Sequence, residues 1–170
     1  MKQRILNIGS GRENYGTDFI DLFPKRAEVI KCDISKETLP YRDKTFDIVY
    51  SRRVIAHLSD PYNFFYESYR VLKKGGKIMV DTHNANVMFA MRTYNGSFKG
   101  EYKIYCLFNA HSLKNCLEEV GFKNVTVRHV FDEPEKYQRD MTTQLGKQVH
   151  LVLGAIDKTL KPVIIATGYK

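Results

Sequence analysis

Two glycines and two aspartates, each at the end of an apolar run, are the residues whose types and spacing could hold a ligand. Gly9 and Gly11 follow the first run, and a turn without Cβ atoms lets backbone N–H groups approach a ligand closely. Asp21 ends the second run, where a carboxylate can accept hydrogen bonds from both hydroxyls of a ribose. Asp33 follows the third run and can meet the exocyclic amine of an adenine, while Ile34 offers the ring an apolar wall. Each signal alone is weak, because a structural turn or a helix cap explains it about as well.

An alternation of strand-like and helix-like segments must position these residues, and it favours a mainly parallel sheet covered by helices. Strands are expected over residues 5–8, 19–23, 28–32, 46–51, 77–81, 124–131 and 163–167. One helix is expected to begin at Ser59-Asp60-Pro61 and to stop at Gly75-Gly76. A second helix is expected over residues 107–120, with Gly121 as its stop, and an apolar stripe over residues 137–160 predicts a further helix.

Length and composition limit the class of protein. The 170 residues fit one domain with one core, and 43% apolar residues are ordinary for a globular chain. No run is long enough to span a bilayer and the first residues lack a signal-peptide pattern, so a cytoplasmic location is the expectation. The three scattered cysteines indicate reduced, structural thiols and no metal site. The net charge of +8 suits nucleic acid or acidic substrates as partners, but a solvated basic surface explains it equally well.

Two further segments, read in order after the glycine turn and the aspartates, make the pattern specific. They are LPYRDKTFDIVYSRRVIAHLSDP over residues 39–61 and RVLKKGGKIMVDTHN over residues 70–84. The combined order resembles the class I S-adenosylmethionine-dependent methyltransferases of the type 11 group. The resemblance covers about residues 4 to 84, with weaker similarity to about residue 130. A nicotinamide dehydrogenase shares the glycine turn but is not expected to carry the last two segments.

The resemblance implies an α/β fold of the Rossmann-like kind. The sheet would have seven strands, mostly parallel with the last strand antiparallel, flanked by helices, and some N-terminal helices would be trimmed because little chain separates the first three strands. The chain would form one methyltransferase domain over residues 1–170. Residues 85–110 would build a lid over the methyl acceptor, and residues 137–160 a C-terminal helical insertion that could also serve a homodimer.

The resemblance also assigns residues to S-adenosylmethionine, the cofactor that it implies. The cofactor-binding residues would be Gly9, Ser10 and Gly11 at the amino acid end, Asp21 at the ribose, Asp33 and Ile34 at the adenine, and Ser51 and Arg52 beside the methyl group. Asn84, at the mouth of the fifth strand, would face the acceptor.

Histidines and tyrosines are the candidate residues that would deprotonate or contact the methyl acceptor. His57 and His83 are candidate bases for removing a proton from a hydroxyl or amine acceptor, although each is at least as easily a structural histidine. Tyr94, Tyr102 and Tyr105 could stack on a planar or cationic acceptor, or simply pack a flap.

The expected function is methyl transfer to oxygen, nitrogen or sulfur of a small molecule. One alternative is an RNA- or protein-directed methyltransferase, which only the basic charge suggests. Another is a non-catalytic cofactor-binding module, because Asn7 and Ala56 stand where the family has acidic residues.

Overall fold

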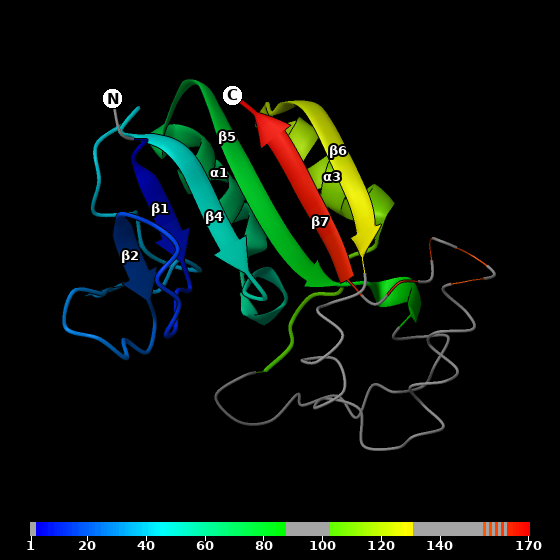
Figure 1. Cartoon of the computed structure of the whole chain (residues 1–170), viewed down its shortest axis with the longest axis horizontal. Coiled ribbons are helices and arrows are strands. Elements are labelled where there is room, and N and C mark those ends of the chain that lie inside the picture. Colours follow the sequence, from blue (N-terminus) through cyan, green and yellow to red (C-terminus); the bar gives the residue numbers. More distant parts are fainter. Residues whose placement is uncertain are drawn as a thin grey trace.

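A seven-stranded sheet forms the centre of the protein (Figure 1). The structure is a computed structural model that describes residues 3–87, 103–130 and 163–170, together with residues 155, 157, 159 and 161. The strands are β1 Ile5–Ile8, β2 Asp18–Asp21, β3 Ile30–Lys31, β4 Phe46–Arg52, β5 Leu72–His83, β6 Lys123–Val130 and β7 Val163–Tyr169. Their order across the sheet is β3-β2-β1-β4-β5-β7-β6.

The strand directions confirm the predicted fold class. The neighbouring strands from β3 to β5 pair in parallel, whereas β7 runs antiparallel to both β5 and β6. In parallel strands the carboxyl ends meet at one edge of the sheet, so the segments that follow β1, β2, β3 and β4 are brought together there.

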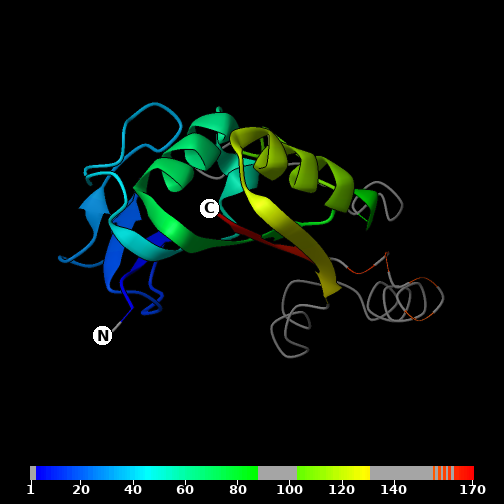
Figure 2. The same ribbon diagram turned by 90° about the horizontal axis from the view of Figure 1, so that it is seen from above.

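Two long helices, α1 Pro61–Val71 and α3 Ala110–Val120, lie on the same side of the sheet (Figure 2). The Asp60 carboxylate caps α1 by accepting hydrogen bonds from the N–H groups of Tyr62 and Asn63, at 2.9 and 3.2 Å. A short 3-10 helix, η1 Ile55–His57, precedes α1. The buried faces of the helices supply the largest core side chains, among them Phe64, Phe65, Leu113 and Leu117.

The predicted end of the first helix was wrong. Helix α1 ends at Val71, and β5 begins at the next residue, so Gly75 and Gly76 lie inside β5. Both glycines bond to Lys170, the residue after β7: Gly75 N–H donates to the Lys170 carbonyl, and Lys170 N–H donates to the Gly76 carbonyl. Gly75 has a φ of 77°, a conformation that glycine adopts without strain, so the glycines here serve a strand irregularity.

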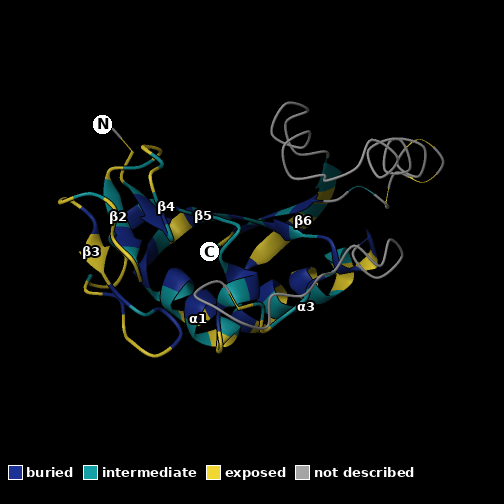
Figure 3. Ribbon diagram, turned by 90° about the horizontal axis from the view of Figure 1, so that it is seen from below, coloured by how far each residue is buried: buried dark blue, intermediate teal, exposed yellow. Residues whose placement is uncertain are grey.

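The trimming of the N-terminal half is confirmed. Residues 9–17 join β1 to β2 and residues 22–29 join β2 to β3, and both connections are described in full and contain no helix. The short edge strand β3 is exposed (Figure 3).

Parts of the predicted acceptor lid and of the predicted C-terminal helical insertion lie outside the described residues. These parts are residues 88–102 of the predicted lid, with Tyr94 and Tyr102, and most of residues 137–160. Within the described parts of the chain, no helix is both long enough and apolar enough to cross a membrane.

Candidate active site

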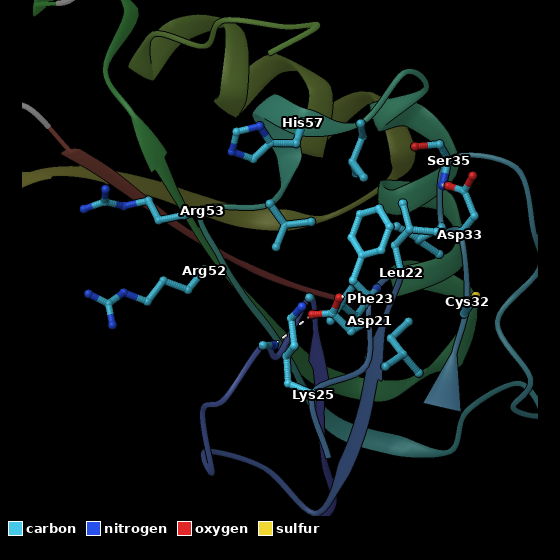
Figure 4. Close-up of a pocket in the computed structure, with 17 residues that line it drawn as sticks. Asp21, Leu22, Phe23, Lys25, Cys32, Asp33, Ser35, Arg52, Arg53 and His57 are labelled. Carbon is cyan, nitrogen blue, oxygen red and sulfur yellow. Dashed lines mark hydrogen bonds between the residues drawn. The ribbon is translucent and has the colours of Figure 1, made fainter. Parts of the chain in front are cut away.

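A pocket of about 230 Å³ lies where the carboxyl ends of β1, β2 and β4 meet (Figure 4). The predicted site residues that line it are Gly9, Gly11, Asp21, Asp33, Ile34, Arg52 and His57. Its apolar lining comes from β1, β2 and the segments that follow β2 and η1. Figure 4 places Arg52 and Arg53 on one side of the pocket and Asp33 and Ser35 on the other.

The glycine turn after β1 forms one wall of the pocket. Gly9 and Gly11 have φ values of 71° and 53°, which side chains disfavour. A Cβ at Gly9 would also overlap the Val54 side chain, whereas the position of a Cβ at Gly11 is open. Ser10 between them is buried, and its hydroxyl oxygen has no hydrogen-bond partner in the described part of the chain.

The Asp21 carboxylate is held in place by two backbone groups. Its Oδ2 accepts a hydrogen bond from Gly11 N–H and its Oδ1 accepts one from Phe23 N–H, both at 2.8 Å. Each carboxylate oxygen has room for a second hydrogen bond. Asp21 therefore fixes the glycine turn and keeps acceptor capacity at the pocket.

Asp33 and Ile34 stand beyond β3 on the far side of the pocket. Asp33 Oδ1 accepts from Ser35 N–H at 3.1 Å, and its Oδ2 lies 3.3 Å from the Lys36 ammonium. Ile34 is buried, and its carbonyl accepts a hydrogen bond of 2.7 Å from the Asn63 amide, which ties the segment to α1.

Arginines at the end of β4 form the opposite wall. Arg52 Nη1 donates to Glu13 Oε1 at 2.9 Å, and Arg52 Nε lies 3.6 Å from Asp81 Oδ2. Arg53 has a φ of 57°, and its N–H donates to the carbonyl and the carboxylate of Asp81. Ser51 is buried and donates its hydroxyl proton to the Ile8 carbonyl, so it joins β4 to β1 and does not line the pocket.

His57 lines the pocket and contacts Lys103, which belongs to the predicted lid. Its Nδ1 is 2.9 Å from the Lys103 carbonyl oxygen, which can only accept, so Nδ1 carries the proton of this contact. The N–H groups of Tyr105 and Cys106 donate to the Ala56 carbonyl. The segment 103–106 therefore lies along η1, with the Tyr105 side chain 56% exposed.

His83 and Asn84, at the end of β5, are not among the pocket-lining residues. His83 Nε2 lies 3.3 Å from Arg53 Nη1, and a guanidinium only donates, so His83 accepts there. Asn84 is fully buried, and its amide donates to the carbonyls of Thr159 and Lys161 at 2.8 and 2.9 Å. Asn84 therefore links the end of β5 to the segment before β7 by hydrogen bonds.

Several pocket residues had no individual signal in the sequence. Phe23, Lys25, Val54 and Leu58 line the pocket because they flank the predicted positions. Cys32 also lines it, and burial raises the pKa of this thiol to about 11, which keeps it uncharged at neutral pH.

Comparisons with known proteins indicate the family of the chain. The sequence profile of the methyltransferase domain family matches residues 2–127. An uncharacterised protein of Methanocaldococcus jannaschii is 28% identical over 151 residues, which are 81% of this chain and 74% of that protein. Phosphoethanolamine N-methyltransferase 3 of Arabidopsis thaliana is 26% identical over 92% of this chain, which spans 34% of that relative's length.

A solved structure shows the same fold. It is an S-adenosylmethionine-dependent methyltransferase of Thermotoga maritima, described as a possible histamine N-methyltransferase. The TM-score is 0.72 at 20% identity, and the match covers all of this chain and 83% of that one. Because the family profile covers most of the chain, the protein belongs to the methyltransferase domain family, and it shares the fold of this S-adenosylmethionine-dependent methyltransferase.

Proposed function

We propose that this protein transfers the methyl group of S-adenosylmethionine to a small-molecule acceptor, with nitrogen as the favoured acceptor atom and oxygen or sulfur as alternatives. The observation that carries the proposal is the pocket that joins the glycine turn, Asp21 and Asp33 around apolar walls.

The residues present fit the cofactor. Asp21 would accept hydrogen bonds from the ribose hydroxyls, because two backbone N–H groups already orient its carboxylate and leave capacity on both oxygens. Asp33 would meet the adenine amine, and Ile34 would pack on the ring. Gly9 and Gly11 would border the amino acid end, because both line the pocket, whereas the buried Ser10 between them does not line it.

When bound, S-adenosylmethionine supplies an electrophilic methyl group, so the protein has to position the acceptor and exclude water. The contacts of residues 103–106 with η1 support a lid over the pocket, because Lys103 bonds to the pocket-lining His57. Tyr94, Tyr102 and Tyr105 remain proposed acceptor contacts on that lid.

His57 is the better of the two candidate bases. It lines the pocket, whereas His83 does not line it and accepts a hydrogen bond from Arg53. We therefore propose that His57 takes the proton of an amine or hydroxyl acceptor, and that His83 orients Arg53.

The names of the relatives support nitrogen as the acceptor atom. The Arabidopsis thaliana relative is named for phosphoethanolamine N-methylation and the Thermotoga maritima structure for possible histamine N-methylation. Both acceptors are small amines.

RNA is the second candidate acceptor, favoured by the charge of +8. Lys73, Lys74 and Lys77 border a hollow of about 330 Å³ at the start of β5, although Asp47 also lines this hollow and binds the Lys73 ammonium at 2.8 Å.

The test is methyl transfer from labelled S-adenosylmethionine to phosphoethanolamine, histamine and total RNA, at low and high salt. Transfer to a small amine supports the proposal. Transfer to RNA alone, falling steeply as salt rises, would favour the second candidate. Tight binding of S-adenosylhomocysteine without transfer to any of them would favour a non-catalytic module.

A further inference from the structure

The connection between β1 and β2 is unusually short for parallel strands. Parallel neighbours are normally joined by a dozen or more residues that include a helix, whereas residues 9–17 alone make this crossover. The same residues carry Gly9 and Gly11, which line the pocket. Without a helix to fix them, other contacts must hold the loop in the shape that faces the pocket.

Arg26 supplies the first of these contacts from the connection between β2 and β3. Its Nη2 donates to the Glu13 carbonyl and its Nη1 donates to the Asn14 side-chain oxygen, both at 2.7 Å. The guanidinium also lies over the Phe19 ring, 4.5 Å from its centroid. The Arg26 side chain is only 19% exposed, so this fork is partly shielded from water.

Arg52 supplies the second contact from the end of β4. Its Nη1 donates to the Glu13 carboxylate at 2.9 Å. Glu13 N–H donates in turn to the Ser10 carbonyl at 2.8 Å, so the tie reaches the turn between the two pocket glycines. We name Glu13, Asn14, Arg26 and Arg52 the loop clamp.

We propose that the loop clamp takes the place of the missing helix and holds residues 9–11 ready for the cofactor, with Arg26 as a positioning residue. This inference rests on the proposed function of the pocket. Arg26 is not among the residues that line the pocket, so its effect on a ligand acts through the loop. A loop that is ordered only on binding lowers the fraction of protein competent to bind, and so weakens affinity.

The test compares R26M, R26K and a matched control, R4M, by calorimetric titration with S-adenosylhomocysteine and by urea unfolding. Arg4 also makes a two-pronged contact, to the Asp18 carboxylate at 2.7 and 3.0 Å, but at the opposite end of β1 and β2. We expect R26M to weaken binding roughly ten- to a hundredfold, the range for losing charge-assisted hydrogen bonds. R26K should recover only part of this affinity, because an ammonium does not reproduce the two hydrogen bonds that the guanidinium makes to Glu13 and Asn14.

The control separates positioning from plain stability. R4M should lower the urea midpoint of unfolding. It should leave the dissociation constant for S-adenosylhomocysteine within about twofold of wild type, because Arg4 and the pocket are not expected to be energetically coupled. The double variant E13Q/R26M should lose less affinity than the two single variants combined, because both act on one loop.

Three results would overturn the clamp. The first is R26M binding as tightly as wild type, the second is R4M losing as much affinity as R26M, and the third is additive losses in E13Q/R26M. If the wild-type protein binds S-adenosylhomocysteine and one of these three results is found, only the clamp fails. If the wild-type protein does not bind S-adenosylhomocysteine, the proposed function fails as well.

Discussion

Replacing Asp21 should weaken cofactor binding more than any other single carboxylate change in the pocket. Its two oxygens each accept a backbone hydrogen bond of 2.8 Å, from Gly11 and from Phe23. D21N is therefore not a conservative change, because whichever way the amide turns, its NH₂ faces a backbone N–H. D21A removes both acceptor oxygens, so the N–H groups of Gly11 and Phe23 lose their hydrogen-bond partner.

The expected cost is the loss of a charge-assisted hydrogen bond to the ligand, about 1.5–3 kcal/mol, or roughly ten- to a hundredfold in the dissociation constant. The assay is calorimetric titration of D21A and D21N with S-adenosylhomocysteine, with urea unfolding to check that the variants are folded. D43A is the matched control, since the exposed Asp43 pairs with Arg70 outside the pocket. Folded D21A and D21N that bind as tightly as D43A would refute the placement of the ribose.

Three further predictions concern catalysis, folding and pH. H57Q should lower kcat by roughly a hundredfold or more with little change in cofactor affinity, as for a lost general base, whereas H83Q should lower kcat far less; equal losses would contradict the choice of His57. D60A should cost about 1 kcal/mol in the free energy of urea unfolding because it removes the cap of α1; an unchanged midpoint would be evidence against that cap. Hydrogen bonding to Arg4 lowers the pKa of Asp18 in the folded protein. The pair therefore stabilises the fold above the pKa of an aspartate in the unfolded chain, about 4, and this stabilisation is lost as the pH falls through the lowered pKa of Asp18. The stability deficit of R4M at pH 7 should accordingly shrink at pH 3, and a constant deficit would rule out this linkage.

The placement of Gly9, Asp21 and Asp33 in one pocket follows from local rules. Each lies at or just after the carboxyl end of a parallel strand, and such ends meet at one edge of the sheet. The alternation of segments was therefore enough to favour a mainly parallel sheet, whereas the seven-stranded Rossmann-like fold was predicted from the family resemblance.

The partners of individual side chains could not be predicted in this way. Matching a motif gives Ser51 and Asn84 a position, but the structure uses their polar groups on the carbonyls of Ile8, Thr159 and Lys161. Those carbonyls are distant in sequence, so no spacing rule reveals them.

The same reason explains why the loop clamp was not predicted. Arg26 meets Glu13 and Asn14 only after β1 and β2 have paired with so short a connection. The end of α1 was missed because Gly75 and Gly76 resemble a helix stop, and only the pairing with Lys170 shows that they belong to β5.

We propose that the pocket at the ends of β1, β2 and β4 holds S-adenosylmethionine. The decisive experiment is a crystal structure of the protein with S-adenosylhomocysteine. We expect the ribose hydroxyls on the Asp21 carboxylate, the adenine against Ile34 with its amine at Asp33, and the amino acid end beside Gly9 and Gly11. A ligand bound elsewhere, or one whose ribose makes no contact with Asp21, would contradict it.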